Sequence, residues 1–169
     1  YYHRRQELGT QGSDEWRQAL RSEGAQLDSN SIPRRSALMS QDILVPISPG
    51  ELIDKITILQ IKSDRMQDPA KLANVRIELE LLEKTWRSSP HASHDIEKEW
   101  AELRRINEAL WDIEDKIRDK EREKCFDQEF IELARAVYIT NDERAAVKRT
   151  INTKLGSRIV EEKSYAKYR

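Results

Sequence analysis

Nine residues in the second half of the chain have the types and spacing that can bind a small anion or a sugar. Asn107, Trp111 and Glu114 follow one another at intervals of four and three, so they share one face of a helix. Glu114 also falls on the apolar stripe of that helix, where a buried carboxylate needs a cation or hydrogen-bond donors. The candidate ligand-binding cluster is Asn107, Trp111, Glu114, Asn141, Arg144, Lys148, Glu161, Lys163 and Tyr165.

The same residues also admit a purely structural interpretation. Glu114 can pair with Arg144, Lys148 and Arg149 across a helix interface and fix the helix register, which is the better-attested role of buried ion pairs. The sequence shows no Ser/His/Asp arrangement, glycine-rich phosphate loop or Cys/His dyad. We therefore predict no catalytic residue and no cofactor, and the balance favours a protein that is not an enzyme.

A histidine pair comes nearest to a metal site. His91 and His94 stand three apart beside Asp95, but they lie in a loop, and a metal needs ligands that converge from several elements. The Glu-x-x-His pairs of di-iron bundles are absent. Cys125 is the single cysteine, which makes a structural zinc site improbable. We predict no bound metal.

The composition suits long helices that have one buried stripe and wide solvated faces. Charged residues make up 36% of the chain and hydrophobic residues 37%. The 30 basic and 31 acidic residues nearly cancel, which argues against a nucleic-acid partner because such proteins usually show a basic excess. The single cysteine fits a reducing compartment, and the longest apolar runs are too short to cross a bilayer. We therefore expect a soluble protein without a membrane span.

N-cap and first-turn residues predict where the helices that position the cluster begin. Ser48 suits an N-cap, Pro49 suits the first helical position, and Glu51 completes a capping box, which predicts a helix over residues 49–66. This helix is strongly apolar and should be central. The preceding residues 43–47 form either an extended lead-in or an edge strand.

Two further segments carry continuous apolar seams of the coiled-coil kind. Asp68 and Pro69 begin the first, residues 69–87, and Ser93 caps the second, residues 95–120. Only a short loop joins the segments, so we predict that they form an antiparallel hairpin and cover one another. The first seam is Leu72, Val75, Leu79, Leu82 and Trp86, and the second is Ile96, Trp100, Leu103, Asn107, Leu110, Glu114 and Ile117.

The rest of the chain is predicted to contain two further helices, with an arm before the bundle and a tail after it. Asp127 caps a fourth helix, residues 140–142 break or kink the chain, and a fifth helix ends at Gly156. The predicted fold class is all-α, an antiparallel helical bundle with a long helix hairpin, an extended N-terminal arm and a C-terminal tail.

Three parts are expected along the chain. Residues 1–42 are polar and form an extended or partly helical arm, with a helical turn around residues 13–21. Residues 43–165 form the helical bundle domain, and residues 166–169 are a tail. The chain begins with Tyr1 rather than Met, so we expect that it is either processed, with an upstream targeting segment removed, or truncated, or partly built.

Several strings resemble an uncharacterised bacterial domain family, a domain of unknown function, over residues 43–165. They are ILVPISPGELIDKITIL from Ile43, LANV from Leu72, NEALWDIED from Asn107, TNDERAA from Thr140 and EEKSY from Glu161. The resemblance implies a domain without an assigned activity, loosely associated with surface-polysaccharide gene clusters. Met39 stands where a bacterial member would begin, so residues 1–38 look like an addition.

We expect a non-catalytic helical subunit or adaptor of a larger protein assembly, such as an organellar complex that recruited a bacterial-type domain. The arm and the helix hairpin would contact other protein subunits, and a self-paired seam would make a homodimer. An organelle matrix or stroma is expected, with the cytoplasm as the alternative. One alternative function, a sugar- or nucleotide-sugar-related enzyme or accessory protein of polysaccharide synthesis, follows from the resemblance and the polar cluster. The other, an RNA-binding subunit of a ribonucleoprotein, fits the near-neutral charge less well.

Overall fold

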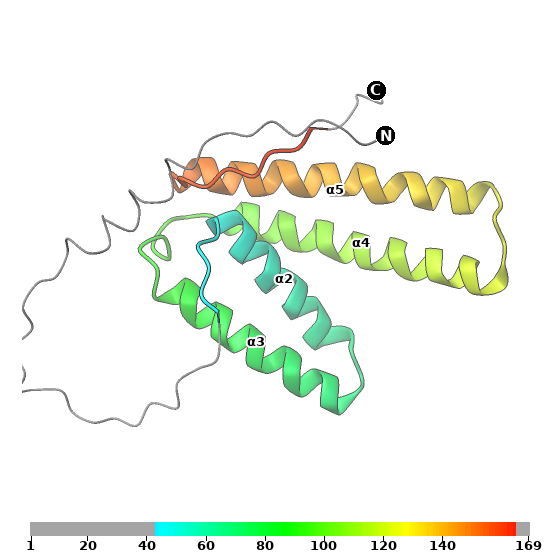
Figure 1. Ribbon diagram of the computed structural model, residues 1–169, viewed down its shortest axis with the longest axis horizontal. Coiled ribbons are helices and arrows are strands. Elements are labelled where there is room, and N and C mark those ends of the chain that lie inside the picture. The colour runs from blue at the N-terminus through cyan, green and yellow to red at the C-terminus, as the bar shows by residue number, and fades with distance from the viewer. Residues whose placement is uncertain (1–42, 165–169) are drawn as a thin grey trace, which may run out of the picture. The chain divides into compact units, whose positions relative to one another are not determined.

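A computed structural model describes residues 43–164, and all regular secondary structure in this range is helical. The helices are α2 (Pro49–Arg65), α3 (Pro69–Arg87), α4 (Glu97–Glu123) and α5 (Gln128–Lys154), as Figure 1 shows. The all-α fold class is confirmed. The predicted arm, including its turn around residues 13–21, and the tail 166–169 lie outside the described residues.

Most of the predicted helix starts are confirmed by their capping bonds. Ser48 Oγ accepts a hydrogen bond from the Glu51 backbone N–H over 3.2 Å at the start of α2. Asp68 Oδ1 accepts from the Ala70 N–H over 2.9 Å at the start of α3. Asp127 Oδ1 accepts from the Phe130 N–H over 3.0 Å at the start of α5. Each cap satisfies a backbone donor that has no partner inside its helix.

One predicted helix start and one strand alternative need correction. Ser93 does not cap α4, which begins at Glu97 with Ile96 at the N-cap and no side-chain capping bond from it. The nearest substitute is Asp95, whose Oδ1 accepts from the Glu97 N–H over 3.3 Å. The lead-in 43–47 is irregular and forms no strand in the described part of the chain, so the edge-strand alternative is wrong.

The predicted break at residues 140–142 is also wrong, because α5 runs through it without interruption. Asn141 donates its side-chain N–H to the carbonyl of Val137 over 3.0 Å, a bond that stays inside the helix. Turn preferences of Thr, Asn and Asp are weak beside the continued packing of α5 on α4. The predicted end at Gly156 is confirmed: its φ is +61°, and the Ser157 N–H donates to the Asn152 carbonyl over 2.9 Å.

Helix α2 lies at the centre of the described bundle and contacts α3, α4 and α5. It is apolar on several sides and buries Leu52, Ile53, Ile56 and Leu59, as its sequence predicts. Helix α3 packs lengthwise on α2 alone among the described helices, and its last turn meets α4 through Trp86. The half-buried residues of α3 include its predicted seam, so this seam covers α2.

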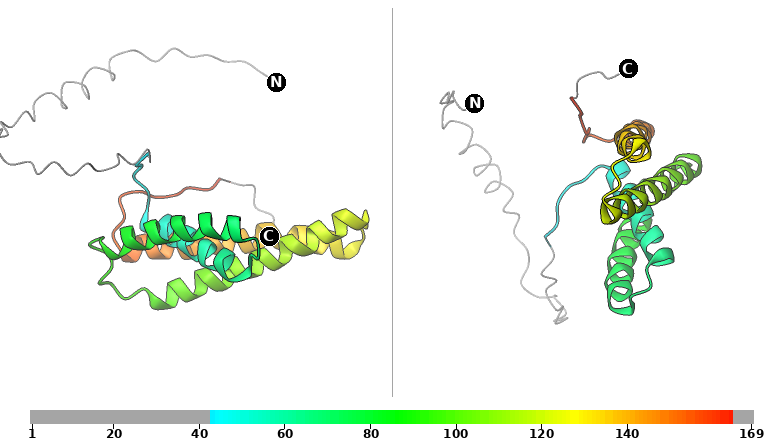
Figure 2. Two further views of the ribbon diagram at one scale, coloured as in Figure 1. Left: turned by 90° about the horizontal axis from the view of Figure 1, so that it is seen from below. Right: turned by 90° about the vertical axis from the view of Figure 1, so that its right-hand side faces the viewer.

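The predicted hairpin of residues 69–87 with residues 95–120 is therefore wrong. The short connections join α2 to α3 and α4 to α5, and these pairs are the hairpins (Figures 1 and 2). Residues 88–96 are long enough to carry the chain past α2 before α4 begins. Trp86 and Trp100 still meet edge to face across this gap, with ring centroids 5.6 Å apart.

The apolar core gathers at the end of the bundle where α2 and α4 begin and α5 ends. The other half of the α4–α5 hairpin extends past α2 and α3 (Figures 1 and 2). Within residues 43–164, none of the helices combines the length and apolarity needed to span a membrane. The core cluster consists of Ile53, Ile96, Leu103, Ile151 and Leu155, with Trp86, Trp100 and Val147 against it.

Candidate functional site

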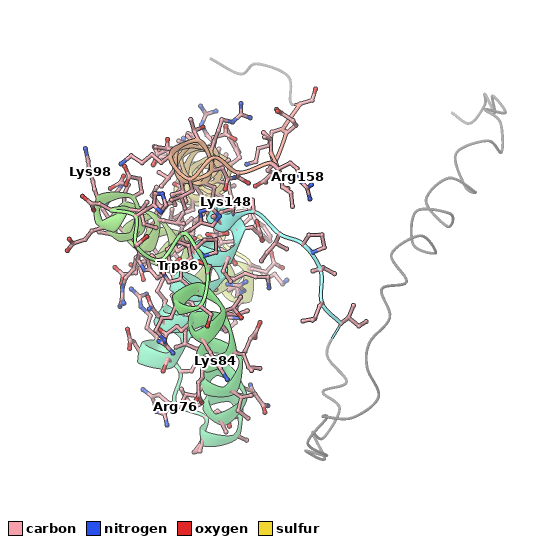
Figure 3. All side chains as sticks on the ribbon, turned by 90° about the vertical axis from the view of Figure 1, so that its left-hand side faces the viewer. Arg76, Lys84, Trp86, Lys98, Lys148 and Arg158 are labelled. Carbon is pink, nitrogen blue, oxygen red and sulfur yellow. The ribbon has the colours of Figure 1, made fainter. Side chains whose placement is uncertain are left out.

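Lys148 is the centre of a buried polar cluster at the junction of α5 with the start of α2 (Figure 3). Only 8% of its side chain is exposed, and its Nζ lies 2.7 Å from Glu51 Oε2, 2.6 Å from Glu161 Oε2 and 3.9 Å from Asp54 Oδ2. Burial disfavours the charged ammonium, but the hydrogen bonds to Glu161 and Glu51 outweigh it, so the pKa of Lys148 lies above its ordinary value. The hydrogen bond from Lys148 likewise lowers the pKa of Glu161. Lys148 is thus charged and fully paired, and it links α5 to α2 and to the segment after α5.

Asn107 extends the cluster from α4. Its Nδ2 donates to Asp54 Oδ1 over 2.8 Å and to Thr57 Oγ1 over 3.0 Å, and the Thr57 hydroxyl donates to the Asp54 carbonyl over 2.9 Å. All three side chains are buried. Asn107 Oδ1 is buried as well but has no donor among the described residues. One acceptor of the network is therefore unsatisfied.

Gly50 brings the backbones of α2 and α5 into direct contact. Its N–H donates to Asn152 Oδ1 over 2.8 Å. A Cβ at this position would lie 2.6 Å from the Lys148 carbonyl oxygen and 2.9 Å from Asn152 Oδ1. Only glycine allows this approach without a backbone shift.

The segment after α5 runs back along that helix (Figure 1) and is held by charges. Besides the Glu161 pair with Lys148, Glu162 pairs with Arg149 at 3.2 Å. Lys163 Nζ donates to the Asn141 carbonyl over 3.2 Å. The string EEKSY therefore acts, in its described part, as an ordered strap on α5.

The nine predicted cluster residues do not converge on one point. Lys148 and Glu161 meet directly, whereas Asn141 and Lys163 meet further along α5. Glu114 is exposed and pairs with Arg118 at 2.7 Å on its own helix, so its predicted burial beside cations of α5 is wrong. Tyr165 lies outside the described residues. That the cluster binds a ligand stays a prediction.

Four of the predicted residues do share a groove, which we call the α4 groove. Asn107, Trp111, Glu114 and Arg144 line it. Its volume is about 450 Å³, within the range of small-molecule sites. Sequence reasoning missed the contribution of α2, because Ile58 belongs to an apolar run and Lys62 looks like ordinary surface. The remaining lining residues are Ile58, Lys62, Leu110, Asp115 and Arg118.

A second groove of about 430 Å³ lies between the lead-in and the turn after α5. Its lining includes Val45 and Ile47 of the lead-in, Trp86 of α3 and Ile159 of the segment after α5. This groove is mainly apolar, and His91 is one of its lining residues. The His91 and His94 rings stand 6.0 Å apart, and no group of three or more metal-ligating side chains occurs in the part of the chain that the structure describes.

A third feature is the distal hairpin surface, defined by Phe126, Phe130, Ile131 and Ala134. Phe126 is 56% exposed and Ile131 is 49% exposed. The Phe126 and Phe130 rings stack edge to face with centroids 5.2 Å apart. These apolar side chains therefore form one patch beside the α4–α5 turn. The turn is at the opposite end of the hairpin from the core (Figure 1).

Residues 43–168 match the family model described as "Family of unknown function (DUF6165)", and the chain belongs to this family. The match covers the predicted domain and agrees with the expectation of a family without an assigned activity. No curated protein and no solved structure was found to match the chain.

Proposed function

We propose that this protein is a non-catalytic helical subunit of a larger protein assembly, which it joins through the distal hairpin surface. One observation carries the proposal. Residues 130–139 of α5 contain only two charged residues, Glu132 and Arg135, yet no residue of α5 before Lys148 is fully buried. A helix that is apolar on nearly every side is normally covered on every side.

Residues 43–164 supply only part of that cover. Between Gln128 and Val147, α4 runs along one side of α5, and the α4–α5 hairpin extends past α2 and α3 (Figure 2). Phe126 and Ile131 remain about half exposed next to Phe130 and Ala134. Contiguous apolar patches of this kind mark protein-interaction sites. A partner protein with an apolar helical surface fits the patch.

The charges beside the patch favour docking. Lys120 pairs with Asp127 at 2.8 Å and with Glu129 at 2.5 Å, so these charged groups beside Phe126 are already paired with one another. Apolar surface surrounded by polar groups that are already paired is typical of a protein interface.

We propose an organelle matrix or stroma as the compartment of the assembly, with the cytoplasm as the alternative.

The test is the native size of the full-length protein in an extract of the cells that make it. We expect elution as part of a complex much larger than one chain, and we expect Ile131→Lys to release the monomer because it puts a charge into the interface. Ile77→Lys is the matched control: Ile77 is 60% exposed on α3 and lies away from the patch.

Three results would contradict the subunit role. Wild-type protein could elute as a single chain, or as a dimer of this chain alone. Equal release by Ile131→Lys and Ile77→Lys would also count against the distal hairpin surface.

The α4 groove supports a second candidate function, that of an accessory protein binding a small ligand. The supporting observation is that a tryptophan and cations from two other helices border the same groove, namely Trp111, Lys62 and Arg144. An aromatic face beside fixed charges is a common arrangement for ring-bearing anions.

A further inference from the structure

We propose that the α4 groove binds a phosphate monoester of a hydroxylated ring, such as a sugar phosphate or a nucleoside monophosphate. The inference is independent of the subunit role, because the groove is complete within one chain and shares no residue with the distal hairpin surface. It makes the second candidate function specific by naming the ligand class.

The groove offers an apolar face to a ring. Ile58, Leu110 and Trp111 line it, and Trp111 contributes a partly buried indole. The guanidinium of Arg65 stands 5.9 Å from the centroid of the indole ring and is itself ion-paired with Asp112. Trp111 is thereby held in place before any ligand arrives, which favours stacking of a flat ligand surface.

The charge of the groove calls for an anion. Arg118 pairs with both carboxylates of the groove, Glu114 at 2.7 Å and Asp115 at 3.7 Å, and offsets one of their two negative charges. Among residues 43–164, no ion pair is formed by Lys62 of α2 or Arg144 of α5. Three cations and two carboxylates line the groove, and a phosphate between Lys62 and Arg144 would balance the excess.

Asn107 supplies a second, independent indication of a ligand. Asn107 is 5% exposed, and its side-chain Nδ2 donates to Asp54 and Thr57. Its Oδ1 accepts no hydrogen bond from any of the described residues. Asn107 lines the groove. A buried acceptor without a donor is unfavourable, and a ring hydroxyl is the donor that would satisfy it.

The experiment is a titration of the full-length ¹⁵N-labelled protein, followed by the indole N–H signal of Trp111. Assignment of that signal comes from Trp111→Phe. The probes are adenosine 5′-monophosphate, glucose 6-phosphate, inorganic phosphate and adenosine. We expect a saturable shift with one or both phosphate esters, and at least about tenfold weaker binding of phosphate or adenosine alone, because each lacks one half of the recognised chemistry.

The Kd values of the two esters show which part of the ligand the groove recognises. Tighter binding of the nucleotide would indicate stacking of its base on Trp111. Tighter binding of the sugar phosphate would indicate a hydrogen bond from a ring hydroxyl to Asn107. Both outcomes support the proposal. Inorganic phosphate binding as tightly as the esters would mean an adventitious ion only, and an unmoved Trp111 signal would exclude the site. Either result would overturn the proposal.

Variants locate the phosphate. Lys62→Gln and Arg144→Gln should each raise the Kd of the tighter ester by about tenfold, the cost of a lost charge-assisted hydrogen bond. Arg144→Lys retains the charge and should retain part of the affinity, which guards against a folding defect. Lys84→Gln and Arg76→Gln remove the same charges from α3, which lends no residue to the groove (Figure 3), and should leave the Kd unchanged. Equal weakening by these controls would contradict a defined site.

Discussion

The two ends of α5 lie in opposite surroundings. Near its C-terminus, Lys148, Ile151 and Asn152 are buried against α2 and α4, and Lys148 and Asn152 form ion pairs or hydrogen bonds with the start of α2. Near its N-terminus the helix is more apolar, but none of its residues is fully buried. The C-terminal part of α5 thus buries polar groups together with the apolar core, whereas its N-terminal part leaves apolar groups partly exposed.

This contrast separates the residues that define the fold from those left for a partner. Buried charges and amides tolerate few arrangements, because each must find its hydrogen bonds, so the Gly50, Lys148 and Asn152 contacts specify how α2 crosses α5. Exposed apolar residues such as Ile131 contribute little to the isolated chain and gain most when another surface covers them. Five substitutions can break or sharpen this comparison.

The largest effect is expected for Lys148→Met. Loss of the ammonium leaves Glu51, Asp54 and Glu161 without their shared cation at a site where Lys148 is 8% exposed. We expect the free energy of unfolding to fall by about 3 kcal/mol, as for other broken buried pairs. Urea unfolding measures it, with Lys84→Met on exposed α3 as the control. Equal stability of the two variants would contradict the linking role of Lys148.

Gly50→Ala should follow, with a loss of about 2 kcal/mol, because the new methyl group collides with the Lys148 carbonyl oxygen. Gly156→Ala tests a glycine needed for a different reason: it has open space around it but a φ of +61°. That change should cost about 1 kcal/mol. The order of the two thermal midpoints checks the prediction, and the reverse order would show that the close approach of α2 to α5 is unimportant.

Glu161→Gln should change the pH dependence of stability. The pKa of Glu161 is lowered in the folded chain, so its contribution is present above its unfolded pKa and is lost as the pH falls through the folded value. Wild type should therefore be more stable than Glu161→Gln at pH 7, and the difference should shrink below about pH 4.5. A difference that stays constant down to pH 3 would argue against the charged pair with Lys148.

The smallest effect on the purified chain is expected for Ile131→Lys. Ile131 is 49% exposed, so the free energy of unfolding should change by less than about 0.5 kcal/mol. Differential scanning calorimetry of the purified variant gives this value. A large loss would mean that the chain itself covers Ile131, and the release expected in extracts would then have to be attributed to unfolding.

Helix starts were predictable because they depend on neighbouring residues. Ser48, Asp68 and Asp127 each bond a backbone N–H two or three residues ahead, and such bonds are visible in sequence. Which helices lie side by side was not predictable in the same way. The seam of α3 needed an apolar partner, and both α2 and α4 offered one; the order was decided by the long connection 88–96 and by the central position of α2.

The candidate site was predictable in part. Lys148 and Glu161 carry charges that the fold brings together, but Asp54 and Thr57 were missed, although two polar residues three apart in an apolar helix were a usable signal. The burial of Glu114 was wrongly predicted because no residue of α4 after Leu110 is fully buried. A seam position that is buried in the first half of α4 is therefore exposed at Glu114. Periodicity gives the face of a helix but not how far its cover extends.

Amide hydrogen exchange, resolved along α5 in the purified full-length protein, tests the central claim most directly. We predict a gradient along one helix: amides of residues 148–154 should exchange at least about 100-fold more slowly than those of residues 132–140, because only the former are locked to α2. Uniform protection from end to end would show that the distal half is already covered in the isolated chain, and the division between fold and binding surface would be wrong.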